Sequence, residues 1–208
     1  MFLPHKNMIK FVKNKKDWQV LNLSKGFTLI ETLVAISIFS ISILSMMSVL
    51  SSGISNTDYA KKKMIATYLA QEGIEYIRNM RDTYVLSRTT SQQGWIGFQS
   101  KIDLSCKNSN FCYFDDAKFL TSGLISDTDI YNCNILPGGL CINLFYNTTT
   151  GQYGYDQING VDSGFTRSIN VTFPLDDNEI KVYSKVSWTQ GSGPHSITLT
   201  EDLFNWVE

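Results

Sequence analysis

The feature that most constrains this 208-residue sequence is an apolar run near its N-terminus. Residues 27–54 are FTLIETLVAISIFSISILSMMSVLSSGI, and the only charged side chain among them is Glu31. About 20 such residues in a helix cross the hydrocarbon core of a bilayer, and a water-soluble helix this apolar would need burial on every side. Serine hydroxyls can bond to the carbonyl one turn earlier. The run therefore predicts a membrane-spanning helix.

Charge is divided unevenly along the chain. Residues 1–26 hold six lysines and one aspartate, a net charge of +5, whereas the remainder carries −6. A positive flank upstream of an apolar helix is retained in the cytoplasm, so the body would cross the membrane. A basic start before an acidic body indicates a membrane-targeting leader and an exported domain.

A carboxylate within a spanning helix costs roughly 2–4 kcal/mol, so it usually has a partner or a function. Spacing alone leaves two interpretations of Glu31 open. It could lie hydrated near the cytoplasmic interface, or it could pair with a cation.

The residues around Glu31 distinguish these interpretations. The string SKGFTLIE at residues 24–31 resembles the processing signal of the type IV pilin family, in which a basic leader ends in glycine and an aromatic residue opens an apolar helix. A glutamate follows four positions after the aromatic residue. The resemblance covers residues 1–57, and the combination in this order is highly specific.

The resemblance implies that a membrane prepilin peptidase cuts between Gly26 and Phe27 and methylates the new amine of Phe27. Glycine lets the scissile backbone approach a tight catalytic site. The family pairs its glutamate, here Glu31, with the terminal amine of a neighbouring filament subunit. A matched pair is tolerated inside a bundle of apolar helices, whereas two unpaired charges are not.

The sequence departs from the family pattern in two respects. The leader is long, and Met8 is an alternative start to Met1. The helix-bending proline often found about twenty residues into mature members is missing here. Residues 51–53, Ser-Ser-Gly, are the candidates for a local bend.

Residues 58–84 are predicted to continue the helix as an amphipathic segment, and Glu75 can pair with Arg78 across one turn. The run Gln71–Asp82 resembles the pilus-modification and pseudopilin-I-like branch of the family, which suggests a minor subunit. The three-lysine stretch at residues 61–63 is predicted to be a solvated helix face. The expected buried stripe consists of Ile65, Leu69, Gly73, Ile77, Met80 and Tyr84.

The remainder is predicted to be a β-rich head. Residues 85–164 are loop-rich, and the strand candidates there are Trp95–Phe98, Phe111–Phe114 and Cys141–Tyr146. From residue 165 onward, apolar and polar residues alternate in three runs separated by short turns, which predicts an antiparallel meander. In the first run the inward set is Phe165, Arg167, Ile169, Val171 and Phe173.

All four cysteines lie in the second half of the chain: Cys106, Cys112, Cys133 and Cys141. An even number in an exported region favours disulfides. Local bridges, 106–112 and 133–141, are favoured over the two crossed pairings, and each would contribute roughly 2–3 kcal/mol. Zinc is the competing interpretation, but the close CxxC pairs of structural zinc sites are missing.

The predicted fold class is therefore α+β, with a long N-terminal helical spine packed against a C-terminal antiparallel head, as in pilins. The predicted divisions are the leader at 1–26, the transmembrane or filament-core helix at 27–57, its amphipathic continuation at 58–84, the disulfide-containing region at 85–164 and the meander at 165–208.

The sequence predicts neither catalytic chemistry nor a cofactor. His5 lies in the leader and His195 in an expected surface turn, and neither has a recognisable nucleophile or acid partner. The acidic stretches Asp127–Asp129 and Asp176–Glu179 hold oxygen ligands that could bind calcium, but neither matches an EF-hand loop. We expect no metal site and interpret both as solvated turns.

The leading functional hypothesis is a minor pilin of a type IV pilus-like filament. The alternatives are a type II secretion pseudopilin, a filament-tip adhesion or DNA-binding module and, least favoured, a signal-anchored enzyme. Expected partners are prepilin peptidase, other pilin or pseudopilin subunits and the inner-membrane assembly platform. The acidic body disfavours nucleic acid. The expected location is the inner membrane, single-pass with the head outside the cytoplasm, and then an extracellular or periplasmic filament.

Overall fold

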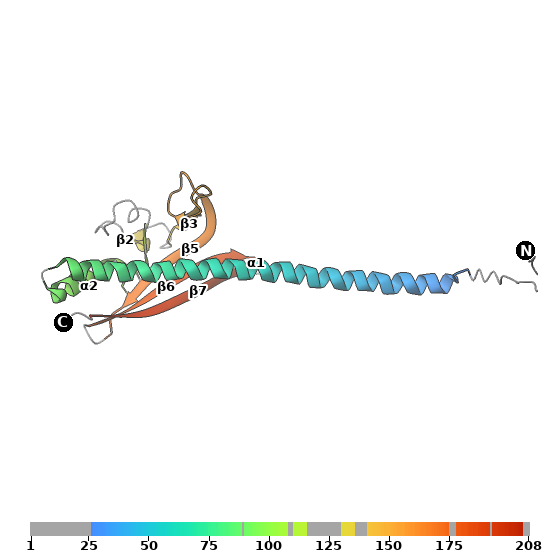
Figure 1. Ribbon diagram of the computed structural model, residues 1–208, viewed down its shortest axis with the longest axis horizontal. Coiled ribbons are helices and arrows are strands. Elements are labelled where there is room, and N and C mark those ends of the chain that lie inside the picture. Colours follow the sequence, from blue (N-terminus) through green and yellow to red (C-terminus); the bar gives the residue numbers. More distant parts are fainter. Residues whose placement is uncertain are drawn as a thin grey trace, which may run out of the picture. The chain divides into compact units, whose positions relative to one another are not determined.

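The computed structural model describes residues 26–88, 90–107, 110–115, 130–135, 141–174, 178–191 and 193–205. The chain divides into two compact units, Met1–Leu50 and Ser51–Glu208. Helix α1, Leu29–Ser87, begins in the first unit and ends in the second (Figure 1). Its backbone remains helical through residues 51–53, the expected site of a bend. The second unit also contains helix α2, Ser91–Cys106, and the sheet.

The described residues form one antiparallel sheet of seven strands. Strand β5 is at its centre: one edge pairs with β6, and the other pairs with β3 and β1. Strand β7 completes the β5–β6–β7 meander, so the antiparallel arrangement predicted for the end of the chain is confirmed. The strands are β1 (Cys112–Phe114), β2 (Ile130–Asn132), β3 (Asn143–Tyr146), β4 (Tyr153–Gly154), β5 (Val161–Thr172), β6 (Glu179–Gln190) and β7 (Gly193–Phe204), with a 3-10 helix at Cys133–Ile135.

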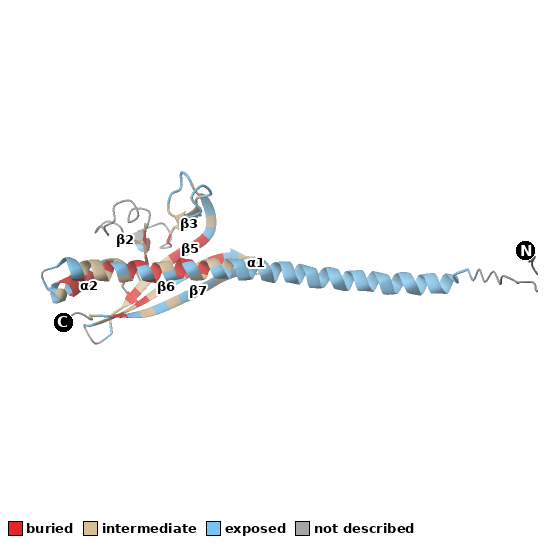
Figure 2. Ribbon diagram, viewed as in Figure 1, coloured by how far each residue is buried: buried red, intermediate tan, exposed pale blue. Residues whose placement is uncertain are grey.

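The core of the second unit lies between α1 and the inner face of the sheet. Buried residues alternate with less buried ones along β5 and β6, as Figure 2 shows. The predicted stripe on α1 is confirmed, since its middle residues are buried and Ile65 and Tyr84 are half-buried. Core residues from α1 include Ala66, Leu69, Ala70, Ile74, Ile77 and Met80, and those from the sheet include Phe165, Ile169, Val171, Val182 and Val186.

Arg167 occupies an inward position of β5 and is completely buried. Its Nη1 lies 2.6 Å from Glu72 Oε2 on α1, and its guanidinium lies 4.1 Å from the ring centroid of Phe114. A buried guanidinium that lost its carboxylate would be costly, so this contact favours one register of α1 on the sheet.

A close approach between α1 and β6 is made at Gly73. A Cβ added there would overlap Ser184 Oγ and lie 3.3 Å from Ser184 Cβ, and Ser184 is itself buried. Glycine is therefore required on this helix face by the proximity of the sheet.

Two sequence-based assignments are wrong. Trp95–Phe98 lies in helix α2, not in a strand. Thr90 caps that helix by accepting a hydrogen bond from Gln93 N, and α2 buries residues at helical spacing: Trp95, Phe98, Ile102 and Cys106. His195 lies in strand β7 instead of a turn, and its ring stacks on Trp188 at a centroid distance of 5.6 Å.

Replacing Gly73 with alanine should destabilise the folded head by about 1–3 kcal/mol, because the new methyl group overpacks the interface between α1 and β6. Thermal unfolding of the purified chain in detergent measures the effect. Gly53→Ala is the matched control, since a Cβ there meets nothing within 4 Å, and it should not destabilise. Adding Ser184→Ala to Gly73→Ala should restore part of the loss, and strict additivity would contradict the proposed contact.

Candidate processing and assembly site

Helix α1 begins directly after the predicted cleavage junction. Gly26, Phe27 and Thr28 precede its first residue, Leu29. Thr28 Oγ1 accepts a hydrogen bond from the backbone N–H of Glu31 at 3.3 Å, and Thr28 O accepts one from Thr32 N at 3.2 Å. Thr28 thus satisfies a backbone donor of the first turn in the manner of an N-cap residue.

Capping by Thr28 was missed by the sequence analysis, although the signal was present. Thr28 and Glu31 have the spacing of the S/T-x-x-E capping pattern, followed by an apolar run. The cap places Glu31 in the first turn of α1, where the helix dipole favours a carboxylate. Among the residues that the structure describes, no cation forms an ion pair with Glu31.

The part of α1 that lies in the first unit is exposed along its whole length. Every residue from 29 to 50 is exposed, and the segment is uniformly pale blue in Figure 2. Phe27, immediately before the helix, is 80% exposed. Within the described residues α1 is the one helix long and apolar enough to cross a membrane.

Four of the five serines in residues 29–50 satisfy their hydroxyl groups within the helix. Ser40, Ser42 and Ser45 each donate to the carbonyl four residues earlier at 2.8–2.9 Å, and Ser37 donates to Val34 O at 2.8 Å. The hydrogen bonding predicted for these serines is confirmed. Their hydroxyls therefore add little cost to placing the helix in an apolar environment.

Gly26 lies in open space. A Cβ built there meets no atom within 4 Å, and its φ lies outside the positive range that favours glycine. Nothing in the described fold requires glycine at this position, so the protein's own packing does not account for it.

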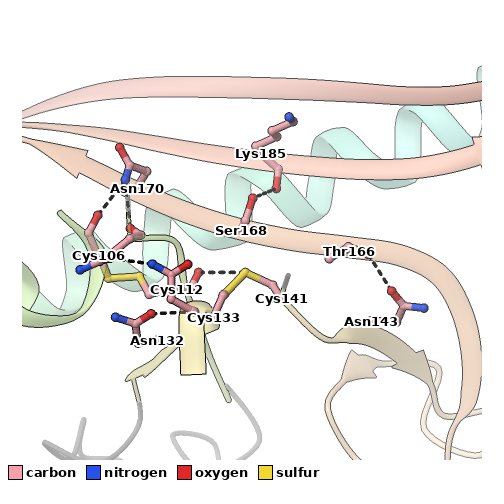
Figure 3. Close-up of a disulfide and its surroundings, with 12 residues drawn as sticks. Cys106, Cys112, Asn132, Cys133, Cys141, Asn143, Thr166, Ser168, Asn170 and Lys185 are labelled. Atoms are coloured by element: carbon pink, nitrogen blue, oxygen red, sulfur yellow. Dashed lines mark hydrogen bonds between the residues drawn. A yellow bond between two sulfur atoms is a disulfide. The ribbon is translucent and has the colours of Figure 1, made fainter. Parts of the chain in front are cut away.

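The four cysteines form two disulfides in the head, Cys106–Cys112 and Cys133–Cys141. The first joins the end of α2 to β1, and Figure 3 shows both close to β5. Asn170 of β5 donates through Nδ2 to Cys106 O and Asn110 O, both at 3.0 Å. Asn170 thus ties Cys106 and Asn110 to the central strand β5, while the disulfides join α2 to β1 and the 3-10 helix to the residue two before β3.

No group of three or more His, Cys, Asp or Glu side chains suited to a metal ion occurs among the described residues. Asp127–Asp129 and Asp176–Asp177, two stretches considered for calcium, lie outside them.

Comparison with known proteins finds a family model that matches the N-terminal segment containing this site. The family model described as the prokaryotic N-terminal methylation motif matches residues 21–47. The matched range contains Gly26, Phe27 and Glu31 together with the first turns of α1. No curated protein and no solved structure matches the chain.

The motif and the fold together support a type IV pilin-like protein, with a long N-terminal apolar helix followed by an antiparallel sheet. The motif implies processing by prepilin peptidase and assembly with other pilins, and it points to a structural subunit rather than an enzyme. The apolar helix fits a membrane-anchored pilin.

Replacing Gly26 with leucine should abolish removal of the leader, because the side chain prevents close approach of the scissile backbone to the peptidase. Immunoblotting of cells that contain a prepilin peptidase would show only the full-length chain. Gly53→Leu is the matched control, since that glycine also lies in open space, and its product should be processed. A Gly26→Leu protein of normal mature size would disprove the cleavage assignment.

Proposed function

We propose that this chain is a minor pilin, a low-abundance structural subunit of a type IV pilus-like filament that assembles through the first half of α1. The observation that carries the proposal is the single carboxylate, Glu31, in the first turn of α1, whose residues 29–50 are otherwise uncharged and all exposed. An apolar surface of this length requires cover from lipid or from other apolar helices.

Cleavage between Gly26 and Phe27 would create the cation that Glu31 requires. The new α-amine of Phe27 would lie about one helical turn from Glu31, and methylation would leave its charge in place. In a filament the Glu31 carboxylate would pair with the amine of an adjacent subunit. Because an unmatched charge is costly among packed apolar helices, the pairing would fix the axial register of each added subunit.

The charged run on α1 favours a minor subunit and has a structural role in this chain. Glu72 pairs with Arg167 of β5, and Arg78 forms hydrogen bonds with both carboxylate oxygens of Glu201 on β7 and an ion pair with Glu75. The hydrogen bond to Glu201 raises the pKa of Arg78. The residues that resemble the minor-pilin branch thus fasten the helix to two strands.

A pseudopilin of a type II secretion system is the second candidate, because it would use the same helix and the same peptidase. In either case we propose that the precursor is anchored in the inner membrane, with its lysine-rich leader inside and its acidic head outside. The mature chain would then enter an extracellular filament or a periplasmic one.

Glu31→Leu should leave cleavage intact but reduce incorporation into filaments. Loss of a buried charge partner costs about 3 kcal/mol, so the content of the variant in sheared filaments should fall by roughly 100-fold if register depends on the pair. Ser37→Leu in the same segment is the control, since it alters polarity without altering charge, and it should assemble normally. Wild-type incorporation of Glu31→Leu would refute the pairing role.

A further inference from the structure

The face of the sheet that is turned away from α1 carries a polar groove. Thr166, Ser168 and Asn170 alternate with the buried residues of β5 and therefore point outward. Two adjoining hollows of about 290 Å³ each lie over β5 and β6, and both include Phe111, Ser168 and Lys185. Figure 3 shows Lys185 beside Ser168, with Thr166 further along β5 and Asn143 of β3 hydrogen-bonded to Thr166. The first hollow is also lined by Cys141, Asn143, Thr166 and Ser187. The second hollow is also lined by Asn170, Thr172, Tyr183 and Thr198.

Lys185 is the cation of this groove, and none of the described residues forms an ion pair with its ammonium group. Strand register explains why. Lys185 stands opposite Ser168 on β5 and Thr198 on β7, so both cross-strand neighbours are uncharged. Lys181 faces the same side of β6 but stands opposite Asp202, and its Nζ lies 3.3 Å from the Asp202 carboxylate.

Hydroxyl and amide groups make up most of the remaining groove wall. Neither hollow is lined by a carboxylate, although the chain downstream of residue 26 has a net charge of −6. Phe111, which is 41% exposed, adds an aromatic surface to both hollows. Three of these side chains already hydrogen-bond within the protein: Asn143 to Asp162, Thr166 to Asn143, and Asn170 to two backbone carbonyls. The hydroxyl groups of Thr172, Ser187 and Thr198 can act as donors and acceptors, which suits a ligand rich in hydroxyl groups.

We propose that this groove binds an acidic carbohydrate, with one ligand carboxylate on Lys185 and a sugar ring against Phe111. A single unpaired cation matches a sugar acid better than a nucleic acid, whose affinity depends on neutralising several phosphates. A bound peptide strand would need an open sheet edge or side-chain pockets, whereas this groove lies over the face of β5 and β6, each of which is paired on both edges. The site would add a binding activity to the proposed structural role.

The probe is tetragalacturonate, titrated calorimetrically into the purified mature chain in detergent at low ionic strength. Its methyl ester is the matched ligand, since it keeps the sugar rings and removes the charges. Tetragalacturonate should bind about tenfold more tightly than the ester, the factor expected for one charge-assisted hydrogen bond. Lys185→Ala should abolish the difference, whereas Lys181→Ala should retain it within about twofold.

Phe111→Ala should weaken binding of both ligands alike, because the ring contacts the sugar and not its charge. Absence of tetragalacturonate binding, equal affinity for the ester, or equal losses in the two lysine variants would each overturn the proposal. Tighter binding of an oligothymidylate than of tetragalacturonate, through Lys185, would assign the groove to nucleic acid instead. The titration involves no filament, so its failure leaves the assembly role to be judged by the Glu31 variants.

Discussion

One constraint governs this protein: the first half of α1 is apolar and exposed on every side. Water cannot be the final environment of such a helix, because the hydrophobic effect favours its removal into lipid or among similar helices. Both environments penalise an unmatched charge, and Glu31 is the only charged side chain from residue 27 to residue 54. The proposed solution is a cation paired with this carboxylate, which cleavage before Phe27 would supply.

The second unit has a separate task, which is to hold a long helix against the inner face of the sheet. Gly73 allows a close approach to Ser184, and the buried guanidinium of Arg167 is matched by Glu72 from the helix. Arg78 makes a corresponding link to Glu201 at the edge strand β7. Two disulfides join the irregular segments to one another and to β1, and Asn170 of β5 binds the backbone of Cys106 and Asn110. The contacts that hold α1 thus lie on the inner face of the sheet, and the proposed groove lies on its outer face.

Much of this fold was accessible from periodicity. The 3.6-residue stripe on α1 predicts a helix with one buried face, and the alternation in β5 and β6 predicts strands with one buried face. The short spacings between the cysteines favoured the disulfide pairing that the structure shows. Helix α2 was missed because Trp95 and Phe98 have high strand propensity, while the cap at Thr90 and the helical spacing of Ile102 and Cys106 were overlooked. The groove was beyond sequence reasoning, since only strand register places Lys181 opposite Asp202 and Lys185 opposite Thr198.

The most direct test of the central claim is the mass of the N-terminal peptide of the protein isolated from cells that contain a prepilin peptidase. The account predicts a mature chain that begins at Phe27 and carries a methyl group on its α-amine. A chain that retains residues 1–26, or one that begins near Gly53 or later as after ordinary secretory cleavage, would contradict it.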